Sequence, residues 1–389
     1  MVNVAKIIES SKTLARNVDG LAKRLFLNNL QVGKEPRIKV LRGFRGVGKT
    51  TALLQMVDEN TVYFSMDDPL VQGESLYDIG SALFKSGFKT LLIDEIHYFP
   101  EWRRHTKSLY DSYPNTGIVL SGSAPLAFEP ERRYEIINID PLSLGEFYHL
   151  ARKAIGTTEA WRSVDDSINF IVKNKEIHAM YEKYLAGGAF PIFFSYGEKT
   201  LNGIYNSINK SIREDAPFFA RVDGEAIRAM NRTIFFLASS TLGEYSVNSL
   251  SNTLDLKKDK TNSIITLLED MRILRLVRPF GKGAKLVRGE PKLMFYHPVM
   301  RKAVCNELKL EANIGAIREE LAVFCFDQRQ WKVNTIKGMK HQPDYVIEKR
   351  GEQLVVEIGG PSKKRTQLKE FGEKTLVITD QQLMALACF

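Results

Sequence analysis

The chain has 389 residues, of which 44% are hydrophobic and 26% are charged, and these values are close to the averages of soluble globular proteins, so a wholly disordered chain is excluded. A single core stops growing at about 250–300 residues, and we therefore expect two or three domains. The formal charge of +9 permits binding to phosphate-rich partners, although basic proteins that bind none are common.

Cysteine usage and the N-terminal segment are typical of a soluble cytoplasmic protein. Cys305, Cys325 and Cys388 show no C-x-x-C spacing, which argues against a disulfide framework or a zinc site and favours a reducing compartment. Residues 1–30 form a charged amphipathic pattern without the apolar region of a signal peptide. No stretch reaches the ~18 apolar residues of a membrane span, so we expect no membrane partner.

Residues 43–50 match the glycine-rich phosphate loop G-x-x-x-x-G-K-[ST], between a strand pattern and a helical pattern. Such a loop opens a helix whose unpaired N–H groups hold phosphate oxygens. We expect Lys49 to reach the β and γ phosphates and the Thr50 hydroxyl to bind Mg²⁺. The alternative is a glycine turn beside a surface lysine. The predicted nucleotide-binding residues are Gly43, Arg45, Gly46, Val47, Gly48, Lys49, Thr50 and Thr51.

Strand and helix patterns alternate through the region that contains this loop. Short, almost wholly apolar strands separated by helices favour a parallel sheet that is covered on both faces and binds its ligand at the carboxyl ends of the strands. The sequence therefore predicts an α/β fold of the P-loop NTPase class. The expected strands are 37–41, 61–64, 90–93, 117–120 and 134–139, with helices near 51–57, 76–85 and 102–110.

Two carboxylates follow the third expected strand. We expect Asp94 to hold hydrated Mg²⁺ and Glu95 to polarise a water molecule for in-line attack on the γ-phosphate. Ser121 or Ser123, after the next strand, could orient that water or simply cap the loop. Arg132 or Arg133 could stabilise the γ-phosphate in cis or in trans. Asp67 and Asp68 fit outer-shell metal ligands and a turn before a proline equally well.

After residue 140 the pattern changes to successive helices, which a Gly-Gly-Ala-Phe-Pro sequence interrupts at 187–191. Residues 225–300 then read as three helices followed by two strands, the order of a winged helix, with Lys282, Lys285 and Arg288 in the wing. Such a module serves protein interaction or hinge movement as often as DNA reading. From about residue 306 the pattern returns to α/β, with a helix at 314–326 and strands at 331–334, 344–348, 353–358 and 375–379.

Several of these motifs together resemble the prokaryotic AAA-type ATPases of the archaeal ATPase group, over most of the chain. In that group a helical segment, a winged helix and a nuclease-like fold follow the ATPase domain. The resemblance implies ATP as the nucleotide, Glu95 as catalytic base, Ser123 as a sensor and Arg133 as a candidate arginine finger. The motifs are Leu41 to Thr50, Leu92-Ile93-Asp94-Glu95-Ile96-His97, Leu120 to Ser123, Arg133-Tyr134 and Pro141 to Phe147.

The last segment resembles the PD-(D/E)XK nuclease fold, whose metal-binding acids would be Asp344 and Glu357, with Glu320 on the preceding helix. Where that pattern has a lysine, this chain has Gly359. A nuclease fold without its charge stabiliser loses a large electrostatic contribution, so we favour an inactive or structural domain over an active one. Lys363 or Lys364 could be a migrated lysine.

The sequence thus predicts an ATPase domain at 1–150, a helical segment at 151–224, a winged helix at 225–303 and a nuclease-like domain at 304–389. We expect a Mg²⁺-dependent ATPase with nucleic acid as the favoured partner; DNA is a candidate, and the sequence leaves the type of nucleic acid open. A nucleotide-gated signalling or interaction protein and an ATP-regulated metal-dependent nuclease are the alternatives. GTP is not excluded by the spacing, although no Asn-Lys-x-Asp motif is present. The oligomeric state stays open, with a homo-oligomer or a protein partner among the alternatives.

Overall fold

The computed structural model describes residues 3–122, 132–220, 222–241, 247–281, 289–336, 343–360 and 375–389. The chain forms two compact units. Unit 1 comprises Met1–Asp140 and Arg213–Arg221, and unit 2 comprises Pro141–Ile212 and Val222–Phe389. Unit 1 therefore ends ten residues before the boundary expected at residue 150. It also includes a short segment, 213–221, from the region that was expected to form the helical part.

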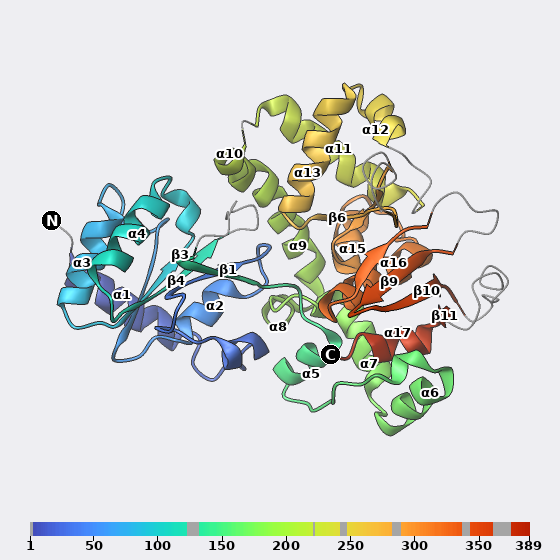
Figure 1. Ribbon diagram of the computed structural model, residues 1–389, viewed down its shortest axis with the longest axis horizontal. Helices are drawn as coiled ribbons and strands as arrows, with labels where there is room; N and C mark the ends of the chain where they lie inside the picture. The colour runs from blue at the N-terminus through green and yellow to red at the C-terminus, as the bar shows by residue number, and fades with distance from the viewer. Residues whose placement is uncertain are drawn as a thin grey trace. The chain divides into compact units, whose positions relative to one another are not determined.

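Unit 1 is built on a five-stranded sheet whose neighbouring strands are all parallel, in the order β2-β3-β4-β1-β5. This confirms the predicted α/β fold of the P-loop class. Helices α3 and α4 pack against each other on one side of the strands, and α2 lies on the other (Figure 1). The strands are β1 (Ile38–Arg42), β2 (Thr61–Ser65), β3 (Thr90–Asp94), β4 (Gly117–Gly122) and β5 (Tyr134–Asn138), and the helices are α1 (Val4–Arg16), α2 (Lys49–Leu54), α3 (Leu76–Lys85) and α4 (Trp102–Ser112).

The parallel register brings the ends of several strands to one edge of the sheet. Leu41 of β1 lies opposite Ser121 of β4, and Ser65 of β2 lies opposite Asp94 of β3. Because side chains alternate along each strand and the strand interiors are buried, polar residues appear where the strands end. The phosphate loop follows β1 at this same edge, as a ligand site in an open α/β sheet requires.

The first part of unit 2 is helical. Gly187 lies in a widened turn with φ of +140°, and a side chain there would also collide with Thr200, so the expected break at this position has a steric basis. The helices are α5 (Leu144–Leu150), α6 (Val164–Lys173), α7 (Ile177–Lys183), α8 (Phe193–Tyr196) and α9 (Thr200–Lys210); the single turn α10 (Ala216–Phe219) belongs to unit 1.

The next elements of unit 2 occur in the order expected for a winged helix. Helices α11 (Gly224–Ser239), α12 (Val247–Leu254) and α13 (Lys258–Asp270) precede the antiparallel strands β6 (Leu274–Val277) and β7 (Lys292–Phe295). The wing residues Lys282, Gly283, Lys285 and Arg288 lie outside the described residues. The assignment as a winged helix therefore stays a prediction.

The C-terminal part of unit 2 is a mixed sheet with helices. Its strand order is β11-β10-β9-β8, with β10 antiparallel to β9 and parallel to β11. The elements are α15 (Pro298–Glu307), α16 (Ile314–Gln328), β8 (Lys332–Asn334), β9 (Tyr345–Lys349), β10 (Glu352–Ile358), β11 (Thr375–Ile378) and α17 (Asp380–Leu386).

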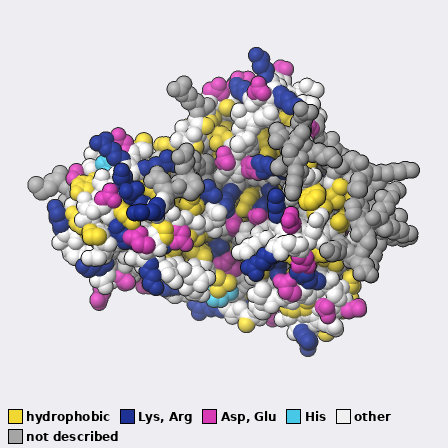
Figure 2. Space-filling view, in the orientation of Figure 1, with side chains coloured by type: hydrophobic (Ala, Val, Ile, Leu, Met, Phe, Trp, Pro, Cys, Tyr) yellow, Lys and Arg dark blue, Asp and Glu magenta, His cyan; other side chains and the backbone are white. Residues whose placement is uncertain are grey.

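Charged side chains of both signs are interspersed over the described residues of the face seen in Figure 2. On α13, the helix that a winged helix would present to DNA, Lys260 forms an ion pair with Glu225, and Lys258 lies 3.9 Å from Glu290. Exposed pairs of this kind contribute little to stability and are readily exchanged for other partners. Among the described helices, none has both the length and the hydropathy needed to cross a bilayer.

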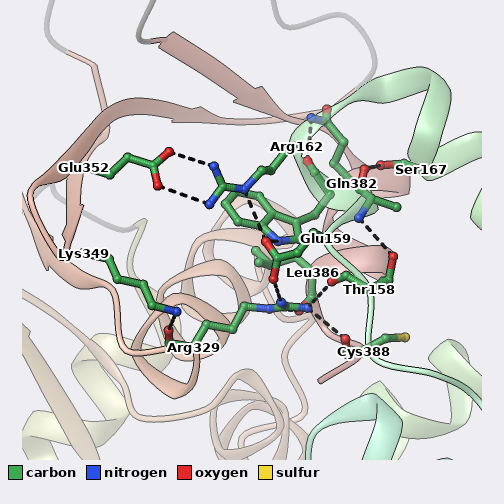
Figure 3. A network of polar contacts seen from close by, with 12 residues as sticks. Thr158, Glu159, Arg162, Ser167, Arg329, Lys349, Glu352, Gln382, Leu386 and Cys388 are labelled. Atoms are coloured by element: carbon green, nitrogen blue, oxygen red, sulfur yellow. Dashed lines mark hydrogen bonds and ion pairs between the residues drawn. The ribbon is translucent and has the colours of Figure 1, made fainter.

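Residues from the start of the helical part and from the C-terminus are joined by a polar network within unit 2 (Figure 3). Arg329 of α16's C-terminal end donates to Glu159 and to the carbonyls of Thr158, Leu386 and Cys388. Trp161 is fully buried against Phe326 and Trp331. The segments expected as separate helical and nuclease-like domains therefore share packing and hydrogen bonds.

Candidate nucleotide site

The phosphate loop has the backbone that its glycines make possible. Gly46 and Gly48 have φ of +83° and +93°, in the left-handed region that side chains disfavour. A Cβ on Gly43 would lie 2.2 Å from the carbonyl oxygen of Ile139, so only glycine fits there. The loop ends where Lys49 begins α2, which points backbone N–H groups of the first turn toward a ligand.

Lys49 is held inside this loop. Its Nζ donates to the carbonyl oxygens of Gly43 (2.8 Å) and Phe44 (3.1 Å). Burial lowers the pKa of the Lys49 ammonium, while the carboxylates of Glu95 and Asp94 act in the opposite direction. A cation in a nearly closed site, with one donor direction left, is suited to phosphate oxygens.

Asp94, at the end of β3, is fixed by three donors and is 1% exposed. Its Oδ2 accepts from the Tyr63 hydroxyl (3.0 Å), and its Oδ1 accepts from the Glu95 N–H (3.0 Å) and from the Ser121 hydroxyl. Ser121 thus holds the carboxylate that the sequence predicts as a metal ligand, a different use from the water orientation considered for it above. Residues that orient a metal ligand in this way strongly affect metal binding.

Glu95 lies next to this carboxylate in a strained backbone conformation, with φ of +47° and ψ of +44°. Non-glycine residues held in this region cost free energy and cluster at functional sites. Burial raises the pKa of Glu95 to about 7, and the charges of Lys49 and Arg45 limit the rise. Its Oε2 is buried and makes no hydrogen bond within the described part of the chain. A carboxyl group with this pKa is suited to accept a proton near neutral pH.

A cavity of about 330 Å³ connects these groups, since Thr50, Tyr63, Asp94 and Glu95 line it together with Ser65, Asp67 and Asp68. The Thr50 hydroxyl and the Asp94 carboxylate are oxygen ligands of the kind that Mg²⁺ prefers. Asp94 already accepts three hydrogen bonds, which fits contact through metal-bound water. A larger cavity of about 670 Å³ lies at the other edge of the sheet, where Thr61 begins β2 and Thr90 begins β3.

Two further polar residues contact the loop. Arg24, 7% exposed, donates to the carbonyl oxygens of Val47 in the loop and of Asp140 at the end of unit 1. Asp215 is fully buried and forms a bidentate ion pair with Arg45, with distances of 2.9 Å from Nε and 2.5 Å from Nη2. His97 lies between Glu95 and Asp215, with Nδ1 3.3 Å from Oε2 of Glu95 and Nε2 3.8 Å from Oδ1 of Asp215.

Not every predicted residue lies at this edge of the sheet. Arg133 immediately precedes β5, at the amino edge, where it lies 3.6 Å from Asp111 and close to the Tyr110 ring. A role on the γ-phosphate of its own chain does not fit this position, because the phosphate loop follows the carboxyl end of the neighbouring parallel strand. Ser123 lies outside the described residues.

Sequence reasoning did not identify Asp215, Arg24 or Tyr63 as site residues. Asp215 lies 170 residues after Arg45, in a region whose pattern is helical, so no local signal marks it. A tyrosine within an apolar strand is usually a core residue. His97 follows the two carboxylates by two and three positions, which is the one signal that could have drawn attention to it.

The acids expected for a nuclease site are not brought together as a triad. The carboxylates of Asp344 and Glu357 accept from the backbone N–H groups of Ile358 (2.7 Å) and Asp344 (3.1 Å), respectively. Glu320, by contrast, is fully buried and its oxygens accept from Arg301 and from the N–H of Phe295. Among the described residues there is no cluster of three acids, histidines or cysteines placed to hold a metal ion. The expectation that Glu320 joins such a site is wrong, because Arg301 neutralises it in the core.

Comparison with protein families identifies two regions. Residues 35–148 match the model of a family described as an AAA domain. Residues 178–311 match a family described as a domain of unknown function, DUF8612. The first match covers the strands, the phosphate loop, Asp94 and Glu95. The parallel sheet and the phosphate loop give this part of the chain the fold of a P-loop NTPase, and the match makes it similar to AAA domains.

One relative resembles most of the chain. The uncharacterized protein MJ1637 of Methanocaldococcus jannaschii is 26% identical in an alignment of 371 residues, and the match covers 86% of this chain and 78% of that protein. Its description assigns no activity. With this coverage, the sequence similarity extends over residues of both units.

Solved structures are similar only at low scores. A signal transduction ATPase with numerous domains from Pyrococcus horikoshii, which carries a tetratricopeptide repeat sensor, has a TM-score of 0.26 at 14% identity; the match covers 82% of this chain but only 45% of that one. PCH-2 of C. elegans has a TM-score of 0.23 at 14% identity, with 68% of each chain covered. Scores this low support no argument about function.

Proposed function

We propose that unit 1 binds ATP with Mg²⁺ and hydrolyses it, and the match of residues 35–148 to the model of an AAA domain supports this. The observation that carries this proposal is the meeting of Thr50, Asp94 and Glu95 on one cavity beside the buried Lys49. A phosphate-binding lysine, a hard-cation ligand pair and a carboxyl group with a pKa of about 7 are the groups that hydrolysis of a phosphoanhydride requires.

Each residue has a separate task in this proposal. The N–H groups of the loop and the Lys49 ammonium hold the phosphates, and Thr50 and Asp94 would hold Mg²⁺, Asp94 through water. When bound, the ion would supply positive charge to the β and γ phosphates. Glu95 accepts a proton from the attacking water, which is placed in line with the bond that breaks. Tyr63 and Ser121 keep the Asp94 carboxylate in one orientation.

The test is a steady-state ATPase assay with purified full-length protein, with Mg²⁺ and with EDTA. We expect metal-dependent release of phosphate, which Lys49→Ala abolishes together with nucleotide binding. Lys89→Ala is the matched control, because Lys89 precedes β3 at the other edge of the sheet. ATP hydrolysis by Lys49→Ala at the wild-type rate contradicts the proposal.

We propose DNA as the partner that stimulates this activity, with α13 as the contacting helix. Its first turn carries Lys258 and Lys260, and the protein has a net charge of +9. The ATPase rate measured with and without single- and double-stranded DNA tests this. Stimulation that is lost in Lys258→Glu/Lys260→Glu supports it, whereas ATP-dependent binding to a protein without response to DNA supports the signalling alternative.

For the C-terminal part we propose a structural role without nuclease activity. Gly359 stands where a nuclease of this fold has lysine, and Glu320 forms a buried ion pair with Arg301. Incubation of plasmid DNA with Mg²⁺ or Mn²⁺ is expected to leave it uncut. Metal-dependent cutting that disappears in both Asp344→Ala and Glu357→Ala contradicts this role and supports the nuclease alternative.

A further inference from the structure

Residues 213–221, here called the return segment, carry a buried carboxylate to the phosphate loop. The chain leaves unit 2 after Ile212, contributes the return segment to unit 1, and re-enters unit 2 at Val222. Asp215 is 0% exposed, while its neighbours Arg213 and Glu214 are exposed. A buried carboxylate needs a well-placed cationic partner, and here that partner is Arg45 of the loop.

Aromatic rings of the return segment make further contacts with unit 1. Phe218 and Phe219 contact the ring of His97 at centroid distances of 5.6 Å and 5.9 Å, and Phe218 also contacts Tyr98 at 5.1 Å. Helix α10 is a single turn, and Phe218 is 46% exposed. Among the described residues, the return segment is attached to unit 1 through the ion pairs of Asp215 and Glu214 with Arg45, through the buried Ala216 and through the packing of Phe218 and Phe219.

The charge of the Arg45 guanidinium reaches Glu95, the residue proposed to face the γ-phosphate. Arg45 is the third residue of the loop, and its charge acts on the carboxyl group of Glu95, the proposed base. The negative charge of Asp215 also acts to raise the pKa of Glu95 and of Lys49. A γ-phosphate placed between Lys49 and Glu95 would compete with Asp215 for Arg45 and would repel the Asp215 carboxylate.

On the basis of the proposed ATPase function, we infer that Asp215 senses the γ-phosphate: ATP takes Arg45 away from Asp215 and releases the return segment, whereas ADP leaves the ion pair intact. Arginine is suited to this exchange because its planar fork binds a carboxylate and a phosphate in the same bidentate manner. ADP lacks the γ-phosphate, so it does not compete with Asp215 for Arg45.

The release links nucleotide state to unit 2 through the chain itself. The return segment follows α9 and precedes α11, so a change in its attachment changes both connections. Because coupling between two sites is reciprocal, the Asp215–Arg45 ion pair weakens ATP binding by the same factor by which ATP weakens the ion pair. Couplings of this kind usually amount to a factor of roughly 5 to 150.

The first test compares the affinities of wild-type protein and Asp215→Asn for ADP and for a non-hydrolysable ATP analogue, by calorimetry with Mg²⁺. Asparagine keeps the shape of aspartate but not its charge. We expect the dissociation constant of the ATP analogue to fall by a factor of roughly 5 to 150, with that of ADP changed less than about twofold. Glu214→Gln is the matched control, because Glu214 lies 3.8 Å from the same guanidinium but is 48% exposed, and its effect should be small.

Equal changes for the two nucleotides, or weaker binding of the ATP analogue by Asp215→Asn, would overturn the inference while leaving the ATPase proposal standing. Absence of nucleotide binding by wild-type protein and both variants contradicts the ATPase proposal itself, and the inference with it.

A second measurement needs no substitution and so does not depend on how Asp215→Asn folds. Hydrogen–deuterium exchange of wild-type protein is followed in peptides that contain residues 214–220. The ATP analogue is expected to raise exchange there, and ADP is expected to leave it unchanged. Exchange that stays at the nucleotide-free level when the ATP analogue is bound overturns the inference.

Discussion

The hydroxyl of Ser121 donates a hydrogen bond to Oδ1 of Asp94, and so joins the ends of the neighbouring strands β4 and β3. This contact gives Ser121 a different task from the orientation of water. Because Asp94 is also held by Tyr63, its carboxylate has one orientation before any metal ion arrives. Preorganised ligands spare the cost of ordering them during binding.

Removal of the Ser121 hydroxyl should therefore weaken the use of Mg²⁺. We expect Ser121→Ala to lower ATPase activity by roughly 10- to 100-fold, the usual effect of losing a group that orients a metal ligand. Part of the loss should be recovered at higher Mg²⁺ concentration. Ser81→Ala is the control, because this buried hydroxyl of α3 bonds Tyr113 instead. A rate unaffected by Ser121→Ala at limiting Mg²⁺ argues against this role.

The Arg301–Glu320 pair should be structural. Both side chains are fully buried, so removal of one leaves the other as an uncompensated charge. We expect Glu320→Ala to lower the free energy of unfolding of unit 2 by about 3–5 kcal/mol, measured by urea denaturation. Glu352→Ala removes the partner of Arg162 in Figure 3, where the side chains are 46% and 41% exposed, and should cost less than about 1 kcal/mol. Similar losses for the two variants contradict the assignment.

His297 should make the stability of unit 2 depend on pH. Its Nδ1 accepts from the Val299 N–H, and its Nε2 lies 3.0 Å from the Tyr184 hydroxyl. Burial lowers the pKa of His297 from 6.5 to about 3. Below pH 6.5 the unfolded chain therefore binds a proton at His297 that the folded chain does not bind. The contribution of His297 to the free energy of unfolding is thus full above pH 6.5 and is lost as the pH falls toward 3.

Between pH 7 and pH 5 the titration of His297 should lower the free energy of unfolding by roughly 2 kcal/mol. His297→Asn, whose side-chain oxygen can still accept from Val299, lacks the titration. We expect the difference in free energy of unfolding between wild type and His297→Asn to shrink by that amount from pH 7 to pH 5. A difference that is constant over this range contradicts a neutral buried imidazole.

Much of unit 1 was predictable because its signals are local. The sequence 43–50 dictates the loop, and apolar strands that end in Asp94 or Ser121 place those residues at one edge of a parallel sheet. Asp215 could not be predicted, since its position depends on a segment that leaves unit 2 and returns to unit 1. Glu320 was misassigned because its spacing matched a nuclease pattern while its partner Arg301, 19 residues earlier, was not considered.

The measurement that tests the central claim most directly is single-turnover hydrolysis of ATP by Glu95→Gln beside wild-type protein, with nucleotide affinity determined for both. The account predicts that the variant binds ATP at least as well as the wild type but hydrolyses it roughly 10²- to 10⁴-fold more slowly, the range for loss of a general base. Glutamine keeps the size of Glu95 and cannot accept the proton. Hydrolysis by Glu95→Gln at the wild-type rate would contradict the account.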